Sequence, residues 1–574
     1  MKESSMKIPK FRKISDTIIV KIIVLNSLMM SLYSIWSIYT ENNNLSYNIS
    51  VYEPNWSLFL IIGLNMVLLG LIMIRNIINN NIDSITFLMG IFAILMNRLI
   101  IQWFLFIQKA IALHGDHLNQ LGQIKHILNN AHYSSENFYP ITHTIISQFL
   151  LITDLPINVA NYGTGIISAF SIVWIYLLSK ILFEDARLQK ITLILGLLTF
   201  FDRYSLFLMP NGWSIFYLPF ILYIYFKYSK EKKPIILLIF ILSILILPYF
   251  HPLTAVIFIV TLIIFLFLNI YQNKGTIELY SIFVITIIFI SWIMNFKLFE
   301  SNFKILYRVV FTGETFGTYL SRIENSITKL GLDILGIIRL FFIEMGNKAI
   351  LILLAIFSFF YFLCNRSSYR NFPEILRLYL ISGIIFILYL MHLIGIVKLE
   401  ALAGERILAY LYCFIILLLP IIFIVNKSKT ISLTIFSISV ILGIISLYPD
   451  PINFKPSAEI TYGDLSPASF IFSRGYESSS KFLFILTDPK RYRDFYFGGK
   501  LEPFSRDFVG DHFNNINNLA TNERYLIINS IDKITYLSVW KNVGRFSEDD
   551  FMQLYLKNST NKIYTNGGNE VWLV

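Results

Sequence analysis

Long apolar runs recur through roughly the first 450 residues of this 574-residue chain, and they restrict its fold more than any other feature. Many of them have the roughly 17–25 residues that an α-helix needs to cross a hydrocarbon core of about 30 Å. Hydrophobic residues make up 56% of the chain and charged residues 14%, whereas a soluble globular protein has roughly 25% charged residues. The sequence therefore predicts a polytopic α-helical membrane protein.

The apolar runs predict about thirteen transmembrane helices. They lie at 17–39, 57–74, 84–108, 157–182, 190–209, 212–228, 234–250, from Leu253 onward, and at 279–297, 349–364, 378–397, 407–425 and 430–448. Basic residues gather in alternate loops, most densely in KYSKEKKP (227–234), and such loops usually face the cytoplasm. With an odd number of spans, we expect a cytoplasmic N-terminus and an extracytoplasmic C-terminus in a multi-pass protein of the cell membrane.

The division predicted from these runs is a transmembrane domain at 1–449 and a soluble extracytoplasmic domain at 450–574. Two long outer loops are expected, at 109–156 and 298–348. Within the first, 141–153 is apolar but too short to span, which favours an interfacial helix. The tail has candidate strands at 481–486, 524–529 and 569–574, typical of a small α/β or α+β domain, of which we predict α/β.

The net charge of +11 belongs to the membrane part, because the tail from Leu447 onward holds 14 basic and 15 acidic residues. Basic cytoplasmic loops account for it, so it gives no support to a nucleic-acid partner. The two cysteines, Cys364 and Cys413, support neither a disulfide framework nor a cysteine-based metal site.

One polar segment, His114–His143, lies between apolar regions and carries Asp116, Glu136 and five of the eight histidines in the chain. We interpret this segment as a candidate site of chemistry at the membrane surface; the alternative is that it is only a solvated connecting loop. Three cationic candidates, His251, Lys398 and Arg406, fall in other predicted outer loops. A carboxylate can act as general base toward an acceptor, and cationic groups can bind a departing phosphate. This combination suits sugar transfer from a lipid-phosphate carrier.

Several short motifs stand out: Gly115–Asp116–His117, NFYPITH (137–143), HPLT (251–254), GER (404–406) and the end of the tail, KIYTNGGNEVWLV. Together they resemble the GT-C superfamily of multi-span, polyprenyl-phosphate-dependent glycosyltransferases. The chain departs from that family in having two extra spans before the acidic loop and no second acid beside Asp116. It also lacks a WWDYG-like signature, which argues against bulk N-glycosylation and for transfer of a smaller sugar.

The resemblance implies an inverting transfer from a polyprenyl-phosphate sugar to a protein, lipid or cell-wall glycan acceptor. Asp116 would be the catalytic carboxylate, and Arg406, His251 and Lys398 would bind the donor phosphate. His117, Tyr139 and His143 would contact substrate. No cofactor is expected; a divalent cation is not favoured with one clear acid, and the histidine spacing is not that of a standard metal site.

Each of these residues also has a structural alternative. Asp116 could cap the following helix, and Tyr139 could be an interfacial aromatic anchor. His251 could cap a helix, and Arg406 could pair with Glu405 or reach lipid headgroups.

Two further residues are more ambiguous. Glu136 could be a second acid, although a solvated loop glutamate is its default. Arg98 lies within a predicted span, where a charge usually faces protein or water, and it is expected to pair with an acid that the sequence does not identify.

Two other functions remain open. A lipid-linked glycan transporter or flippase would have buried charges in several spans, interrupted helices and internal repeats. A non-catalytic membrane scaffold would tolerate substitution in the polar loop but not in the tail. No Walker, HExxH or GxSxG motif occurs in the chain, so ATP-driven transport, zinc protease and serine hydrolase functions lose their simplest support.

Overall fold

The computed structural model of this chain describes most of its residues. They are 10–41, 49–50, 56–108, 110–135, 137–200, 202–270, 276–296, 332–365, 372–393, 404–425, 429–474, 481–499, 506–508, 524–556 and 560–574.

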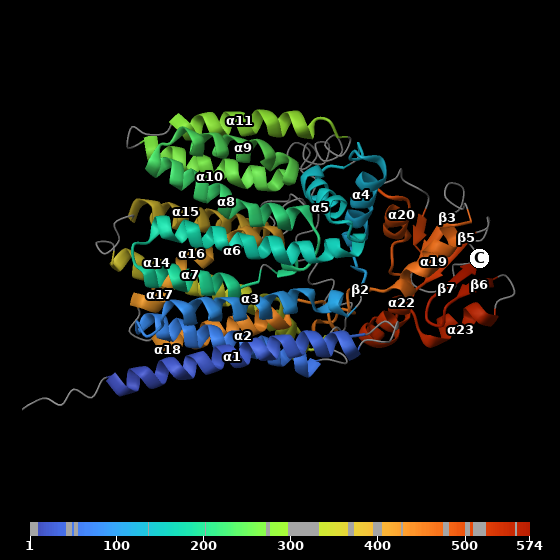
Figure 1. Cartoon of the computed structure of the whole chain (residues 1–574). Helices are drawn as coiled ribbons and strands as arrows, with labels where there is room; N and C mark the ends of the chain where they lie inside the picture. Colours follow the sequence, from blue (N-terminus) through green and yellow to red (C-terminus); the bar gives the residue numbers. More distant parts are fainter. Residues whose placement is uncertain are drawn as a thin grey trace, which may run out of the picture.

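A bundle of long helices fills one part of the molecule, and a smaller mixed domain lies at one end of it (Figure 1). The bundle contains α1 (Lys10–Glu41), α2 (Trp56–Ile78), α3 (Ser84–Ile107), α6 (Gly163–Leu182), α7 (Ala186–Leu198), α8 (Pro210–Glu231), α9 (Pro234–Phe250), α10 (Pro252–Ile270), α11 (Thr276–Ile293), α14 (Ile334–Cys364), α15 (Phe372–Leu393), α16 (Gly404–Leu418), α17 (Pro420–Val425) and α18 (Lys429–Ile445). In the described residues, eight helical segments are long and apolar enough to cross a membrane. The prediction of a polytopic helical membrane protein is confirmed.

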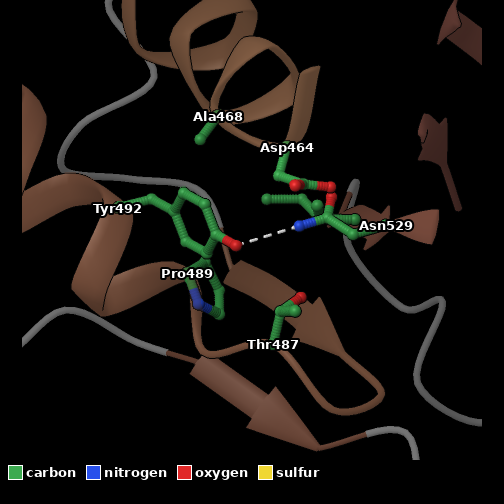
Figure 2. A pocket seen from close by; sticks show the side chains of 7 residues that line it. Asp464, Ala468, Thr487, Pro489, Tyr492 and Asn529 are labelled. Atoms are coloured by element: carbon green, nitrogen blue, oxygen red, sulfur yellow. Dashed lines mark hydrogen bonds between the residues drawn. The ribbon is translucent and has the colours of Figure 1, made fainter. Parts of the chain in front are cut away.

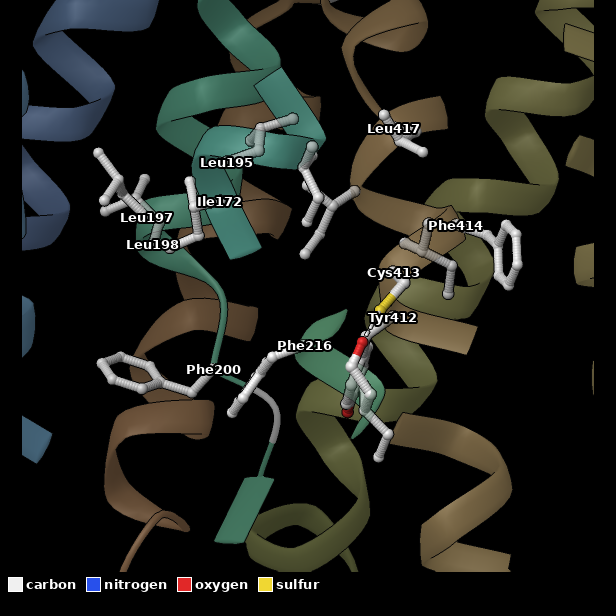
Figure 3. Packing of buried hydrophobic residues seen from close by; sticks show 14 of the residues in the cluster. Ile172, Leu195, Leu197, Leu198, Phe200, Phe216, Tyr412, Cys413, Phe414 and Leu417 are labelled. Carbon is white, nitrogen blue, oxygen red and sulfur yellow. Dashed lines mark hydrogen bonds between the residues drawn. The ribbon is translucent and has the colours of Figure 1, made fainter. Parts of the chain in front are cut away.

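The centre of the bundle is the segment formed by α16 and α17. Its stretch Arg406–Ile424 is long and apolar enough to cross a membrane, and 94% of an 18-residue window within it is buried inside the protein. Figure 3 shows side chains of α6, α7 and α8, among them Ile172, Leu195 and Phe216, packed toward Tyr412–Leu417. A helix that is apolar on all sides is stable only when protein or lipid surrounds it. By contrast, α1 leaves large apolar side chains such as Trp36 exposed at the edge of the bundle.

One predicted span is wrong in its second half. The run 190–209 forms α7 only as far as Leu198, and the chain then continues without regular α-helix to Pro210. The predicted outer segment 298–348 is described from residue 332, and from Ile334 onward it belongs to the 31-residue helix α14. Its remainder lies outside the described residues.

The buried side chain of Arg98, in α3, explains why α7 stops where it does. Its Nη1 atom donates to the carbonyl oxygens of Gly196 (3.3 Å), Leu197 (2.8 Å) and Thr199 (2.7 Å). The guanidinium carbon lies 4.5 Å from the centre of the Phe200 ring. The last carbonyls of a helix have no partners within it and carry partial negative charge. Arg98 supplies both hydrogen-bond donors and positive charge to these carbonyl groups. Its described partners are therefore backbone carbonyls at the end of α7, and the predicted pairing with an acid is not seen among the described residues.

The C-terminal domain is built on a five-stranded sheet of order β4-β3-β5-β7-β6. Its strands are β3 (Lys481–Phe484), β4 (Arg506–Phe508), β5 (Arg524–Ile528), β6 (Asn561–Thr565) and β7 (Glu570–Leu573). Strands β4, β3 and β5 are parallel, whereas β7 is antiparallel to β5 and β6. The domain's helices are α19 (Tyr462–Phe472), α20 (Pro489–Phe497), α22 (Ser530–Ile534) and α23 (Glu548–Leu556). The three predicted strands correspond to β3, β5 and β7, and the predicted α/β class is confirmed.

The polar loop after α3 joins the bundle to this domain. Strand β1 (Ala112–Leu113) pairs antiparallel with β2 (Glu459–Ile460). Helix α4 (His117–Asn130) follows β1 and packs against α20 (Figure 1). Buried leucine and isoleucine side chains of α4 share one apolar cluster with Ile460, Phe472 and Tyr492 of the domain. Loop and domain therefore form a continuous layer at one end of the bundle.

Helix α5 (Pro140–Thr153) corresponds to the predicted interfacial helix. One of its faces is buried through Ile146 and Leu150, while Phe149 and Ile152 on other faces are exposed. A short helix that is buried on one side and apolar on the other suits a position at the edge of a membrane.

Candidate functional site

The first residue of the candidate site, Asp116, stands at the start of α4. It follows Gly115, whose φ of +99° is a conformation that glycine adopts without strain. Asp116 occupies the N-cap position, but its side chain makes no capping hydrogen bond to α4. About half of the side chain is exposed (49%), and its carboxylate forms an ion pair with Arg491 of α20. The Asp116 carboxylate therefore does not cap α4, which was the structural alternative for this residue.

A second feature joins α5 to the turn between α9 and α10. The rings of Tyr139 and His251 are stacked, with centroids 4.8 Å apart and planes 11° from parallel. The backbone N–H of Tyr139 donates to Asn137 Oδ1 at 3.1 Å. His251 Nδ1 accepts from the backbone N–H of Leu253 at 3.3 Å, which satisfies a free donor at the start of α10. In the neutral ring, Nε2 then carries the proton and is a hydrogen-bond donor.

The charges of Arg406 and Asp116 act on these stacked rings. Burial lowers the pKa of His251 to about 3, and the Arg406 charge adds to this effect. Burial raises the pKa of Tyr139, with Arg406 opposing the change and Asp116 adding to it. Arg406 lies in the first turn of α16, close enough to Tyr139 and His251 for its charge to act on both. The structure thus brings Asp116, Tyr139, His251 and Arg406 together from four separate segments.

His117, the residue after Asp116, is fully buried. Its Nε2 lies 2.8 Å from Asn161 Oδ1, and Asn161 Nδ2 donates in turn to the Ile111 carbonyl at 2.7 Å. The ring also packs at an angle against Phe106 and Phe207. Burial lowers the pKa of His117 to about 4. These contacts fix the start of α4 to the segment before α6.

His143 is also buried and has an amide oxygen at each ring nitrogen. Its Nδ1 lies 3.0 Å from Asn137 Oδ1 and its Nε2 lies 2.6 Å from Gln120 Oε1. Burial lowers its pKa to about 3. His143 therefore ties α5 to α4 and to the residues just before Tyr139.

Two predicted site residues, Glu136 and Lys398, lie outside the described residues. Across the part of the chain that the structure describes, no group of three or more His, Cys, Asp or Glu side chains could hold a metal ion. His126 and His132 lie with their ring centroids 5.4 Å apart at the far end of α4.

A hydrogen-bonded chain below Arg406 was not predicted from the sequence. Tyr410, one turn further along α16, donates to Asn211 Oδ1 at 3.0 Å and also bonds the Thr254 hydroxyl. Thr254 in turn bonds Ser214 at 2.6 Å. The chain links α8, α10 and α16 beneath the site. The HPLT motif contained Thr254, but nothing in the sequence paired it with a tyrosine in a distant span.

Figure 2 shows a hollow inside the C-terminal domain, lined by residues that include Asp464, Thr487, Tyr492 and Asn529. Asn529 Nδ2 donates to the Tyr492 hydroxyl at 3.1 Å. The space has no room for a water-sized molecule. It belongs to the packing of the domain, and we do not assign a substrate to it.

No family model and no curated protein matches the sequence. Among solved structures, the chain is similar to ArnT from Cupriavidus metallidurans. The apo form has 11% sequence identity and a TM-score of 0.45, over 84% of this chain and 98% of ArnT. The form bound to undecaprenyl phosphate has 9% identity and a TM-score of 0.45, over 85% of this chain and 97% of ArnT.

Proposed function

We propose that this protein is a GT-C-type membrane glycosyltransferase, which transfers a sugar from a polyprenyl-phosphate carrier to an acceptor at the membrane surface. The observation that carries the proposal is the convergence of Asp116, Tyr139, His251 and Arg406 at one end of the bundle. One carboxylate and two phosphate-binding groups there lie next to helices long enough to hold a lipid tail beside them.

In the proposed reaction, an acceptor hydroxyl or amine attacks the anomeric carbon of the donor sugar. The bond between that carbon and the phosphate oxygen breaks, and the polyprenyl phosphate leaves. Asp116 accepts the proton that the acceptor loses, which is the role of a general base. A single displacement of this kind inverts the configuration at the anomeric carbon. The exposed half of the Asp116 side chain leaves the carboxylate accessible to an acceptor.

Arg406 and His251 are assigned to the donor phosphate in different ways. Arg406 supplies positive charge and hydrogen bonds, which suit a phosphate oxygen. His251 is neutral at physiological pH, because burial and Arg406 lower its pKa, and it therefore supplies an Nε2–H donor without charge. Tyr139 stacks on the His251 ring and restricts its orientation. Lys398 remains a proposed second cation for this phosphate.

The substrate contacts predicted for His117 and His143 are reassigned in this proposal. Both rings are buried with amide partners from neighbouring segments. We assign them to holding α4 and α5 in place below the reacting groups. The reaction as proposed uses protein side chains as its cationic groups and assigns no metal or other cofactor a role.

We place this end of the bundle on the extracytoplasmic side, with the N-terminus in the cytoplasm. The turn between α8 and α9 lies at the opposite end (Figure 1) and contains Lys232 and Lys233, with Lys230 in the last turn of α8. Basic loops of this kind usually remain in the cytoplasm. The acceptor would then be a protein, a lipid or a cell-wall glycan that is reached from outside.

Transport of a lipid-linked glycan is the second candidate, and buried charges favour it. Besides Arg98, a buried group links α8, α10, α11 and α15, in which Asn269 donates to Glu278 at 2.8 Å and accepts from Arg377 at 2.5 Å. The Tyr225 hydroxyl also donates to Glu278. These charges have protein partners within the bundle. A transporter would move labelled lipid across proteoliposomes without forming a glycosylated product.

The decisive experiment uses the full-length protein in lipid nanodiscs. Undecaprenyl phosphate serves as the binding probe, and a panel of polyprenyl-phosphate sugars with membrane-lipid and peptide acceptors serves for transfer. We expect Asp116→Asn to bind undecaprenyl phosphate as the wild type does and to lose at least about 100-fold in transfer rate. Full transfer activity in Asp116→Asn, at wild-type thermal stability, would refute the assigned role.

A further inference from the structure

The C-terminal domain contributes a charged side chain to the site that the helical bundle otherwise forms. Arg491, in the first turn of α20, pairs its Nη1 with Oδ1 of Asp116. We infer that Arg491 is a positioning residue, which holds the Asp116 carboxylate in the orientation for proton transfer. The inference rests on the proposed function and assigns the C-terminal domain a direct part in it.

The Asp116 carboxylate depends on this contact because the local backbone does not hold it. The side chain makes no capping bond to α4, and Gly115 before it has no side chain to support it. Among the described residues, the Asp116 carboxylate has one ion-pair partner, Arg491. A half-exposed carboxylate without such a partner rotates among staggered conformers. An arginine contact through Oδ1 fixes the carboxylate and leaves Oδ2 available to an acceptor.

Arg491 reaches Asp116 because other contacts fix α20 against α4. The backbone N–H of Gly499, just after α20, donates to the Gly122 carbonyl at 2.7 Å. Lys125 Nζ donates to the Tyr496 carbonyl, also at 2.7 Å. The β1–β2 pair and the shared apolar cluster add to these. Removing the Arg491 side chain therefore leaves the domain docked against α4. The change removes only the ion-pair partner of Asp116.

The expected kinetic effect follows from this arrangement. Arg491 touches the base and not the groups assigned to the donor phosphate, so its loss slows the chemical step while donor binding persists. A displacement of about 1 Å in a reacting group can reduce the rate by about 100-fold. Lysine is shorter and has no planar fork, but it retains the charge, so it should restore part of the rate.

The test uses the full chain in nanodiscs with Arg491→Gln, Arg491→Lys and, as matched control, Lys125→Met. Lys125→Met removes a different α4–α20 contact and leaves Asp116 with its partner. We expect kcat to fall about 10- to 100-fold in Arg491→Gln and partly recover in Arg491→Lys. Donor KM and undecaprenyl phosphate affinity should stay within about twofold of wild type, and Lys125→Met should keep its kcat.

The outcomes separate this inference from the proposed function. If Asp116→Asn is inactive and Arg491→Gln keeps the wild-type kcat, the inference is wrong and the function stands. Equal losses in Arg491→Gln and Lys125→Met, with lower melting temperatures in both, would reduce Arg491 to a docking contact and also overturn the inference. If Asp116→Asn retains full transfer, the role assigned to Asp116 is wrong, and the inference about Arg491, which depends on it, is wrong as well.

Discussion

Gly122 is the position at which one added methyl group tests most directly whether the C-terminal domain sets the geometry of the site. A Cβ atom there would lie 2.3 Å from the carbonyl oxygen of Asp494 and 2.8 Å from its carbonyl carbon. An ordinary van der Waals contact begins at 3.4 Å, so α4 and α20 must separate by about 1 Å in Gly122→Ala. The atoms in the way are backbone, which cannot rotate aside.

That separation has an energetic consequence that can be measured. The hydrogen bond from Gly499 to the Gly122 carbonyl, now 2.7 Å, would stretch beyond useful length, at a cost of about 1 kcal/mol. Overpacking adds about 1–3 kcal/mol, so the docking of the domain should weaken by about 2–4 kcal/mol in total. The same shift would draw Arg491 away from Asp116, and a displacement of this size can reduce transfer about 100-fold.

Hydrogen exchange and limited proteolysis of the full-length protein would detect the weakened docking, and transfer kinetics would detect the change at Asp116. Gly383→Ala, in α15, is the matched control, because a Cβ there meets no atom within 4 Å. Alanine should stabilise that helix by about 0.5–1 kcal/mol. Unchanged exchange protection and full activity in Gly122→Ala would refute the reasoning.

Four further outcomes are expected. Arg406→Ala should weaken undecaprenyl phosphate binding about 10- to 100-fold, the equivalent of a charged hydrogen bond of about 1.5–3 kcal/mol, whereas Arg406→Lys should retain most of the affinity in the same titration. Asn161→Ala removes the described partner of His117 Nε2 and should lower the free energy of unfolding by about 1–3 kcal/mol. Burial lowers the pKa of His117 to about 4 in the folded protein, against about 6.5 in the unfolded chain. The stability that the neutral ring contributes is therefore complete above pH 6.5 and should fall by about 3 kcal/mol as the pH is lowered to 4. Melting curves at stepped pH, with and without His117→Gln, measure this loss. EDTA should leave the transfer rate unchanged, since the proposal assigns the phosphate to side chains, and a rate that recovers only on adding a divalent cation would contradict it.

The helices of the bundle could be predicted because membrane burial acts locally. Apolar runs of sufficient length must pair their backbone groups within one helix, and their ends coincide with polar or basic residues. The one clear failure, at 190–209, has a cause that no local pattern contains. Helix α7 ends at Leu198 because Arg98, far earlier in the chain, binds its last carbonyl groups. The sequence marked Arg98 as unusual but could not show which partner it would have.

The candidate site could be predicted in part for a similar reason. Asp116, Tyr139, His251 and Arg406 all fall in loops of one predicted face, and loops of the same face must meet at the same end of a bundle. His117 and His143 fall there too, but their residue type does not show whether a ring nitrogen faces a ligand or an amide. Their partners Asn161, Asn137 and Gln120 carry no sequence signal that pairs them with these histidines, and Asn161 falls within the predicted span 157–182.

The contribution of the C-terminal domain shows where sequence reasoning stops. Helix α4 has an apolar side, with Leu118, Leu121 and Ile124 buried, and such a stripe predicts that something covers it without naming the cover. The cover is the C-terminal domain, which the α4–α20 contacts, the shared apolar cluster and the β1–β2 pair hold against α4. The same contacts place Arg491 beside Asp116. Because one set of contacts determines both the burial of α4 and the partner of the carboxylate, a change that loosens the domain should reduce catalysis before it unfolds the bundle.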